Sequence, residues 1–192
     1  MSAVRKPILK IACLGWGSLI WDPRALPIRR EWFKDGPLAP VEFTRRSSGG
    51  RITLVIDPSA KLMRVLWALM LPTDLQVARE ALCDRENIKR EDALSLIGSW
   101  QLRDKAPQNI PNLPQWAEDR GLDAVIWTAL GPTFEKEEKS PSVAKVIQYL
   151  RARVGTERDH AKEYIERTPR QIDTDYRRQI EAALGWSCKS VI

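Results

Sequence analysis

Two short segments of the sequence carry residue types that can do chemistry, and the first is Gly15–Trp21. It follows the apolar run Ile8–Leu14 directly. Glycines at the end of a strand allow the backbone to turn tightly and to present N–H groups to an anion or to a developing oxyanion. An ordinary turn, with Trp16 and Trp21 packed in the core, is the alternative interpretation of the same residues.

The glycine spacing of this segment excludes the two common nucleotide-binding loops. A dinucleotide fingerprint needs a third glycine at position 20, which Ile20 occupies. A Walker A loop needs a Gly-Lys-Ser/Thr sequence, and this segment has none. An anion-binding turn and a purely structural turn therefore remain as the two interpretations.

Glu86 is the second chemical feature, because it continues the apolar side of an expected helix. Leu75, Ala78 and Leu82 form a stripe at helical spacing, and the next position on that stripe is Glu86. We expect a carboxylate there to be partly desolvated, which favours its protonated form and suits it to proton transfer near neutral pH. The alternative is that the helix bends or ends and that Glu86 faces water.

A single histidine, His160, limits the chemistry open to a chain of 192 residues. Sites built from two or three imidazoles cannot be assembled from it, so we expect no His-rich metal centre. Cys13, Cys83 and Cys188 are far apart and form no CxxC pair, so we expect free or buried thiols in a reducing cytoplasm. A thiol-protease pair of Cys13 or Cys83 with His160 is not expected, because Cys13 lies in an apolar strand and His160 on a polar helix turn. We therefore look for the acid, base or nucleophile elsewhere, and expect neither a metal nor a cofactor.

The net charge of +6 is concentrated in the first third of the chain. Residues 1–60 carry ten Lys and Arg against five Asp and Glu. Such an excess suits phosphate groups, but no recognised nucleic-acid module accompanies it. A solvated basic surface accounts for it more simply, and an anionic small substrate would also suit it. We therefore do not expect a nucleic-acid partner.

The apolar runs of the sequence are too short for a membrane span. None approaches the roughly 18 apolar residues of a spanning helix. The basic N-terminus precedes an apolar run that Lys10 interrupts, and no small-residue cleavage site follows it. We expect a cytoplasmic protein without a membrane partner, whereas the sequence does not indicate its oligomeric state.

The first half of the chain has the residue pattern of short strands. Apolar runs separated by turn residues predict a meander of neighbouring strands, and one more strand is expected later in the chain. These strands are expected at 8–14, 41–44, 51–56, 62–70 and 123–130.

Helical signals dominate from Pro72 onward. We expect the first helix to begin at Thr73, with Gln76 completing a capping box. Further helices are expected at 140–154, with Pro141 at its first position and Gly155 as its stop, and at 157–167 and 175–184, the latter closed by Gly185. Residues 105–119 contain three prolines and are expected to form an ordered surface loop. Strands followed by helices predict one α+β domain over residues 1–192 with a mixed, strongly curved sheet.

Together these segments resemble the γ-glutamylcyclotransferase superfamily, which includes the ChaC-like proteins. The residues Trp16–Leu19 match the Tyr-Gly-Ser-Leu type motif that follows the family's first strand, and Ile20-Trp21 is similar to the ChaC-like version. Residues 74–86 resemble the helix whose final Glu is the family's catalytic acid/base. The family's succession of strands is matched by 41–45, 49–55 and 65–69. The resemblance spans most of the chain and implies a curved sheet or small barrel that encloses a cavity, flanked by helices.

The resemblance implies an enzyme that releases 5-oxoproline from a γ-glutamyl amine, a γ-glutamyl peptide or glutathione. The backbone N–H groups of Gly17, Ser18 and Leu19 would hold the carboxylate or the polarised carbonyl of this small-molecule substrate, and Trp16 would wall the pocket. Glu86 would take a proton from the α-ammonium group, and the freed amine would attack the γ-carbonyl of the same molecule. Protonated Glu86 would then protonate the leaving amine. This chemistry needs no metal, cofactor or covalent enzyme intermediate.

Three departures from the family pattern keep other functions open. Trp16 stands where Tyr is usual and cannot donate a phenolic hydrogen bond; Arg64 replaces the glycine before Val65, and Cys83 stands where Asp is frequent. One alternative is therefore a non-catalytic member of the same fold that binds a small molecule or a protein. Another is a nucleic-acid-associated protein that uses the basic first third of the chain.

Overall fold

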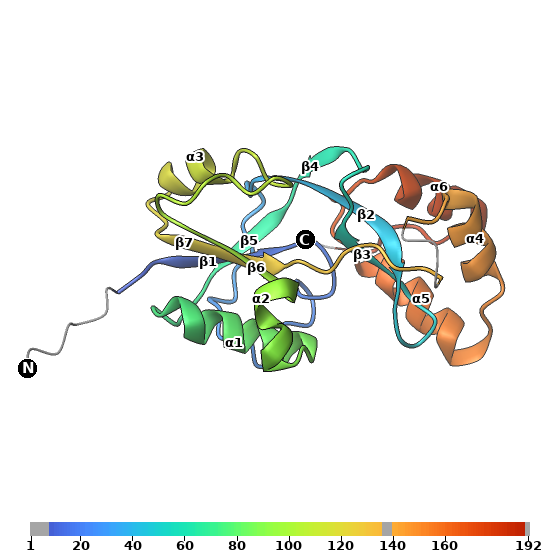
Figure 1. Cartoon of the computed structure of the whole chain (residues 1–192). Helices are drawn as coiled ribbons and strands as arrows, with labels where there is room; N and C mark the ends of the chain where they lie inside the picture. Colours follow the sequence, from blue (N-terminus) through green and yellow to red (C-terminus); the bar gives the residue numbers. More distant parts are fainter. Residues whose placement is uncertain (1–7, 136–139, 191–192) are drawn as a thin grey trace, which may run out of the picture. The chain divides into compact units, whose positions relative to one another are not determined.

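The computed structural model describes residues 8–135 and 140–190 of the chain (Figure 1). These residues group into two compact units, each assembled from separate stretches of sequence. Unit 1 contains residues 8–15, 23–37 and 66–129, and unit 2 contains residues 16–22, 38–65, 130–135 and 140–190.

Unit 1 is built on a four-stranded mixed sheet. Its elements are β1 (Ile11–Gly15), β5 (Leu66–Leu69), α1 (Leu75–Glu86), the 3-10 helix η1 (Arg90–Asp92), α2 (Ala93–Leu96), β6 (Ile97–Gln101), α3 (Leu113–Glu118) and β7 (Ala124–Thr128). The strand order is β5-β1-β7-β6, in which only the β1–β7 pair is parallel. All of β1 is buried, as expected for a central strand covered on both faces. α1 packs against β6 and β7, and Figure 1 shows α3 on the other side of this sheet.

Unit 2 combines a three-stranded antiparallel sheet with three helices (Figure 1). Its elements are β2 (Leu38–Arg46), β3 (Ile52–Ile56), β4 (Leu62–Arg64), α4 (Val143–Arg151), α5 (Gly155–Arg167) and α6 (Asp175–Leu184). β2 lies between the other two strands and carries an irregularity between Phe43 and Arg45. α5 packs against β3, whereas α6 packs against β2 and α4.

The predicted α+β class is confirmed and one of the sheets is mixed, but the small barrel is not found. The described residues form two separate sheets and no closed barrel. β1 pairs with β5 and β7 instead of with β2, its neighbour in sequence. The expected strand 62–70 divides at Val65, so that β4 pairs with β2 in unit 2 and β5 pairs with β1 in unit 1. No turn residue marks this division, which is why one continuous strand was expected.

α1 begins one residue later than the sequence predicted. Its N-cap is Asp74, whose carboxylate accepts hydrogen bonds from the backbone N–H groups of Gln76 at 2.9 Å and Val77 at 3.2 Å. The predicted capping box from Thr73 is therefore wrong, and the Gln76 side chain donates to Glu80 instead. A carboxylate outcompetes a hydroxyl here because it also interacts favourably with the positive end of the helix dipole.

The remaining helix predictions differ mainly at their ends. The helix expected at 140–154 has Ser142 as its N-cap and ends at Arg151, and Gly155 opens α5 with a φ of 55° instead of closing α4. The bounds of α6 and its closure by Gly185, with a φ of 69°, are confirmed. α3 lies within the expected loop 105–119. The sequence did not predict this helix, because a helix of fewer than two turns is too short to show a helical repeat. No helix of the described residues is long and apolar enough to cross a membrane.

Candidate functional site

The segment that follows β1 forms a tight turn in unit 2. The N–H of Ile20 donates to the Gly17 carbonyl at 3.0 Å, and the N–H of Asp22 donates to the Ser18 carbonyl at 2.8 Å. Gly17 and Leu19 are buried and Ser18 is half-buried. Within the described part of the chain, no carbonyl or side chain accepts a hydrogen bond from the N–H groups of Gly17 and Leu19. Backbone N–H groups that a tight turn leaves without acceptors are suited to an anionic ligand.

Position 17 requires a glycine, because another side chain lies too close for a Cβ atom. A Cβ atom at this position would lie 2.3 Å from the hydroxyl oxygen of Tyr164, a residue of α5. Its φ is not in the left-handed region. The glycine therefore serves close packing, whereas the sequence argument had ascribed it to backbone freedom in the turn.

Trp16 is largely buried and belongs to the interior of unit 2. Its side chain is 6% exposed, and its indole N–H donates to the carbonyl of Leu54 in β3 at 3.3 Å. The N–H of Leu54 in turn donates to the Tyr164 hydroxyl at 3.3 Å. Trp21 packs edge-on against Tyr164, with ring centroids 5.3 Å apart. Trp16 thus fastens the turn to β3, and its expected contact with a substrate stays a prediction.

Tyr164 is the residue of this turn that sequence reasoning missed. It lies on the buried side of α5 together with Ala161 and Ile165. Spacings of three and four residues place these side chains on one helical face, so the sequence held a signal that Tyr164 points inward. The sequence held no signal that its hydroxyl would reach Gly17, which is remote along the chain.

Glu86 is the last residue of α1, in unit 1. The side chain is 18% exposed, and its Oε1 atom accepts a hydrogen bond from Nη1 of Arg85 at 2.7 Å. The Arg85 side chain is only 5% exposed. Partial burial of the carboxylate agrees with the expected stripe, but the buried positions of α1 are Ala78, Leu82, Cys83 and Arg85. The ion pair with Arg85 was not predicted.

Arg24 supports the end of α1 from a neighbouring loop of unit 1. Its Nη1 atom donates to the backbone carbonyl of Arg85 at 3.1 Å. This carbonyl is one of the last four of the helix, which receive no hydrogen bond from an N–H group of the helix itself. A cation at this end also interacts favourably with the helix dipole. Arg24 has a φ of 52°, which is uncommon for a non-glycine residue and costs free energy of order 1 kcal/mol.

Cys13 of β1 lies within the electrostatic reach of Glu86. Burial raises the pKa of the Cys13 thiol well above its usual range, and the negative charge of Glu86 raises it further, against a smaller opposite effect of Arg85. A buried thiol of this kind does not form a thiolate near neutral pH, which argues against Cys13 as a nucleophile. All three cysteines are unpaired. Glu86 therefore lies near β1, whose last residue, Gly15, is followed in the chain by Trp16.

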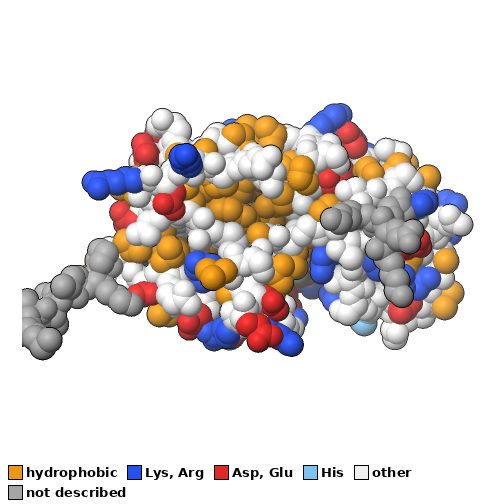
Figure 2. Space-filling model, viewed as in Figure 1, with side chains coloured by type: hydrophobic (Ala, Val, Ile, Leu, Met, Phe, Trp, Pro, Cys, Tyr) orange, Lys and Arg blue, Asp and Glu red, His pale blue; other side chains and the backbone are white. Residues whose placement is uncertain are grey.

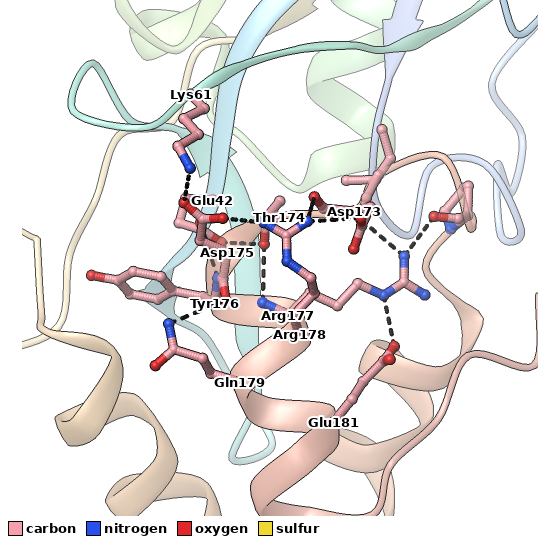
Figure 3. Close-up of polar contacts among 12 residues, drawn as sticks. Glu42, Lys61, Asp173, Thr174, Asp175, Tyr176, Arg177, Arg178, Gln179 and Glu181 are labelled. Carbon is pink, nitrogen blue, oxygen red and sulfur yellow. Dashed lines mark hydrogen bonds and ion pairs between the residues drawn. The ribbon is translucent and has the colours of Figure 1, made fainter.

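A second buried carboxylate, Glu42 of β2, lies at the N-terminus of α6 (Figure 3). It accepts hydrogen bonds from its neighbour Phe43 N–H at 2.9 Å, from the Thr174 hydroxyl, and from Tyr176 N–H at 3.3 Å. Burial raises the pKa of Glu42, while these hydrogen bonds act in the opposite direction. Because its oxygens are occupied by groups of unit 2, Glu42 anchors α6 to β2.

Arg177, in the first turn of α6, has a comparable structural role (Figure 3). Its guanidinium is buried and donates to the carbonyls of Thr168, Pro169 and Ile172 at 2.7 to 3.0 Å. It also pairs with Glu181 at 2.9 Å. Arg177 thereby holds the connection between α5 and α6.

Several basic residues of the first third of the chain make contacts within unit 2. Arg45 donates to the carbonyl of Gly131 and to the Thr133 hydroxyl, Arg51 donates to Ser48, and Arg46 lies 4.8 Å from the centre of the Tyr149 ring. Figure 2 shows Lys and Arg side chains interspersed with Asp and Glu on the face in view. These arginines therefore have structural contacts that do not require a nucleic-acid partner.

The predicted site residues thus divide between the two units. Trp16, Gly17, Ser18 and Leu19 belong to unit 2, whereas Glu86 belongs to unit 1, so their joint use in one site stays a prediction. Among the described residues, no group of three or more His, Cys, Asp or Glu side chains is arranged to hold a metal ion. No protein-family model, curated protein or solved structure matches the chain.

Proposed function

We propose that this chain is a γ-glutamylcyclotransferase-type enzyme that cleaves a γ-glutamyl amine, a γ-glutamyl peptide or glutathione and releases 5-oxoproline. The observation that carries the proposal is the shielded carboxylate of Glu86, at the end of α1 beside a buried guanidinium. The motif Trp16–Leu19 supports it, because its turn holds two backbone donors without acceptors in the described chain. The proposal includes the γ-glutamylcyclotransferase-like fold and its cavity.

The proposed reaction needs one proton carrier and a set of hydrogen-bond donors. Ionised Glu86 takes a proton from the substrate's α-ammonium group, and the resulting amine attacks the γ-carbonyl carbon. Attack within one molecule is favoured because a bound, folded conformer has already lost most of the entropy that the ring closure costs. The N–H groups of Gly17 and Leu19 stabilise the negative charge that develops on the carbonyl oxygen or hold the substrate carboxylate.

The second half of the reaction returns the proton. The attacking nitrogen still carries two protons, of which the lactam keeps one. The tetrahedral intermediate collapses, the bond from the γ-carbon to the leaving nitrogen breaks, and protonated Glu86 gives its proton to that nitrogen. The second proton of the attacking nitrogen passes to the departing amine, so the products are 5-oxoproline and the amine in its ammonium form, and Glu86 is again ionised. One carboxylate thus acts as base and then as acid.

A second candidate function is the binding of a γ-glutamyl compound without cyclisation. Trp16 favours it, because the indole N–H already donates to the Leu54 carbonyl and offers no hydrogen bond to a reacting group. In this case the same turn would hold the ligand, and Glu86 would pair with its ammonium group.

The test is to incubate the wild-type protein and Glu86→Gln with γ-glutamyl amines, γ-glutamyl peptides and glutathione, and to measure 5-oxoproline. We expect release by the wild type and a loss of about 10²- to 10⁴-fold in Glu86→Gln, the usual contribution of a general acid or base. Asp84→Asn is the matched control, because Asp84 lies on the same helix but is exposed and pairs with Arg90.

The outcomes separate the two candidate functions. Equal turnover by wild type and Glu86→Gln would refute Glu86 as the acid/base. Tight binding of a γ-glutamyl compound, measured by calorimetry, without any 5-oxoproline from the wild type would favour the binding function.

A further inference from the structure

The contact between Arg85 and Glu86 is unusual for adjacent residues of a helix. Successive side chains point about 100° apart around the helix axis, so neighbours at i and i+1 do not normally face each other. Here Nη1 of Arg85 nevertheless lies 2.7 Å from Oε1 of Glu86. Glu86 can turn back toward Arg85 because it is the final helical residue and Asn87, with a φ of 54°, ends the helix in the left-handed region.

Burial gives this contact an electrostatic consequence. A guanidinium that is removed from water needs a negative partner, because an unpaired buried charge is strongly unfavourable. The Arg85 side chain is more deeply buried than that of Glu86, so the pair has a shielded cation and a carboxylate that retains some access to solvent. The short contact holds the carboxylate in one orientation at the end of α1.

Neighbouring groups of unit 1 hold Arg85 itself in place. Arg24 donates to its backbone carbonyl, and this contact ties the loop that starts at Pro23 to the end of α1. On the side of β1, the buried Cys13 thiol experiences the charge of Glu86 and offers no competing anion. The carboxylate therefore has one fixed cationic neighbour and a neutral neighbour in the central strand.

We infer that Arg85 is a positioning residue that fixes the orientation of the Glu86 carboxylate. This inference rests on the proposed function of Glu86 as acid/base. The contact engages Oε1, so one fixed orientation of the carboxylate serves both the uptake of the proton from the α-ammonium group and its return to the leaving nitrogen.

Three variants test the inference. Arg85→Met removes the charge while keeping a long side chain, Arg85→Lys keeps the charge but loses the planar fork, and Arg90→Met removes a nearby exposed arginine that pairs with Glu80 and Asp84. We expect kcat for 5-oxoproline release to fall about 10- to 100-fold in Arg85→Met, with a much smaller change in KM. We expect Arg85→Lys to recover part of kcat, and Arg90→Met to behave as the wild type.

The division of the effect between kcat and KM gives a readout that a merely structural role would not move. A misplaced carboxylate slows the chemical step, so kcat should fall in Arg85→Met while KM changes little, and Arg85→Lys should recover part of kcat. Both constants should stay unchanged in Arg90→Met. An unchanged kcat in Arg85→Met would overturn the inference.

A double variant distinguishes a loss of catalysis from a loss of folding. Arg85→Met combined with Glu86→Gln leaves no unpaired buried charge, and a thermal melt compares its folding with that of the single variants. If Arg85 acts through Glu86, removing Arg85 has no further effect on the residual rate of Glu86→Gln. Additive losses would overturn the inference, while activity in the wild type and its loss in Glu86→Gln would leave the proposed function intact. A wild type that releases no 5-oxoproline would overturn both.

Discussion

The close approach of Tyr164 to Gly17 predicts that a larger residue at position 17 destabilises the protein. In Gly17→Ala the new methyl group would meet the Tyr164 hydroxyl at 2.3 Å, so we expect a loss of about 1–3 kcal/mol in the free energy of unfolding, as for other overpacked sites. Urea denaturation measures this loss. Gly131→Ala is the control, because no atom lies within 4 Å of its Cβ position and its φ is not left-handed.

A second substitution identifies the atom responsible. Tyr164→Phe removes the hydroxyl oxygen, after which the nearest ring atom would lie 3.3 Å from the Cβ of Ala at position 17. Tyr164→Phe alone should cost about 1 kcal/mol, because the N–H of Leu54 loses its acceptor. The double variant should therefore be more stable than the sum of the two losses predicts. Strict additivity would show that the hydroxyl is not what excludes a side chain at position 17.

Some features of the candidate-site residues could be predicted from the sequence, and others could not. The stripe of α1 predicted that Glu86 would be shielded, because helical spacing follows directly from the sequence. It did not predict the ion pair with Arg85, because that contact depends on how the helix ends at Asn87. Tyr164 was missed for a different reason: its contact with Gly17 joins residues far apart in the chain.

At the scale of elements, α1 matters most because it carries Glu86. Its N-cap gives a direct prediction: Asp74→Ala should lower the free energy of unfolding by about 1 kcal/mol, the usual value of a lost cap. Thr73→Ala should change it by less than about 0.5 kcal/mol, because the Thr73 side chain does not cap the helix. Thermal melts of the two variants measure the difference. A larger loss in Thr73→Ala would restore the capping box that the sequence suggested.

Elements with local signals were predictable, and those defined by remote partners were not. α6 was placed correctly because Gly185 ends it, and this signal lies next to the helix in the sequence. β6 was missed because its Gly98 lowers strand propensity, although a Cβ there would lie 2.2 Å from the Trp127 ring of β7. The reason for that glycine is a contact with a different strand, which the local sequence does not reveal.

At the scale of the whole molecule, the chain passes between the two units at residues 15–16, 22–23, 37–38, 65–66 and 129–130. Each sheet is therefore assembled from segments that are separated in sequence, and strands that follow each other need not pair. This explains why the expected meander was wrong although most of its strands exist. The division of 62–70 at Val65 falls on one of these passages.

Stability of the whole protein should carry a pH dependence from Glu42. Burial raises the pKa of Glu42 in the folded state above its unfolded value, so the folded state binds the proton more tightly. The contribution of Glu42 to stability is therefore fully present below the unfolded pKa, near 4.3, and is lost as pH rises through the folded pKa. The free energy of unfolding of the wild type, relative to Glu42→Gln, should fall as pH rises from about 4 toward neutrality. A difference that grows over this range would contradict the assignment.

The proposed role of the Glu86 carboxylate as acid/base can be tested by one comparison of rates. Single-turnover release of 5-oxoproline from the best γ-glutamyl substrate is measured for the wild type and for Glu86→Gln at equal, saturating protein concentration. The account predicts a rate about 10²- to 10⁴-fold lower in Glu86→Gln, with the substrate still bound. A Glu86→Gln rate equal to that of the wild type would contradict it.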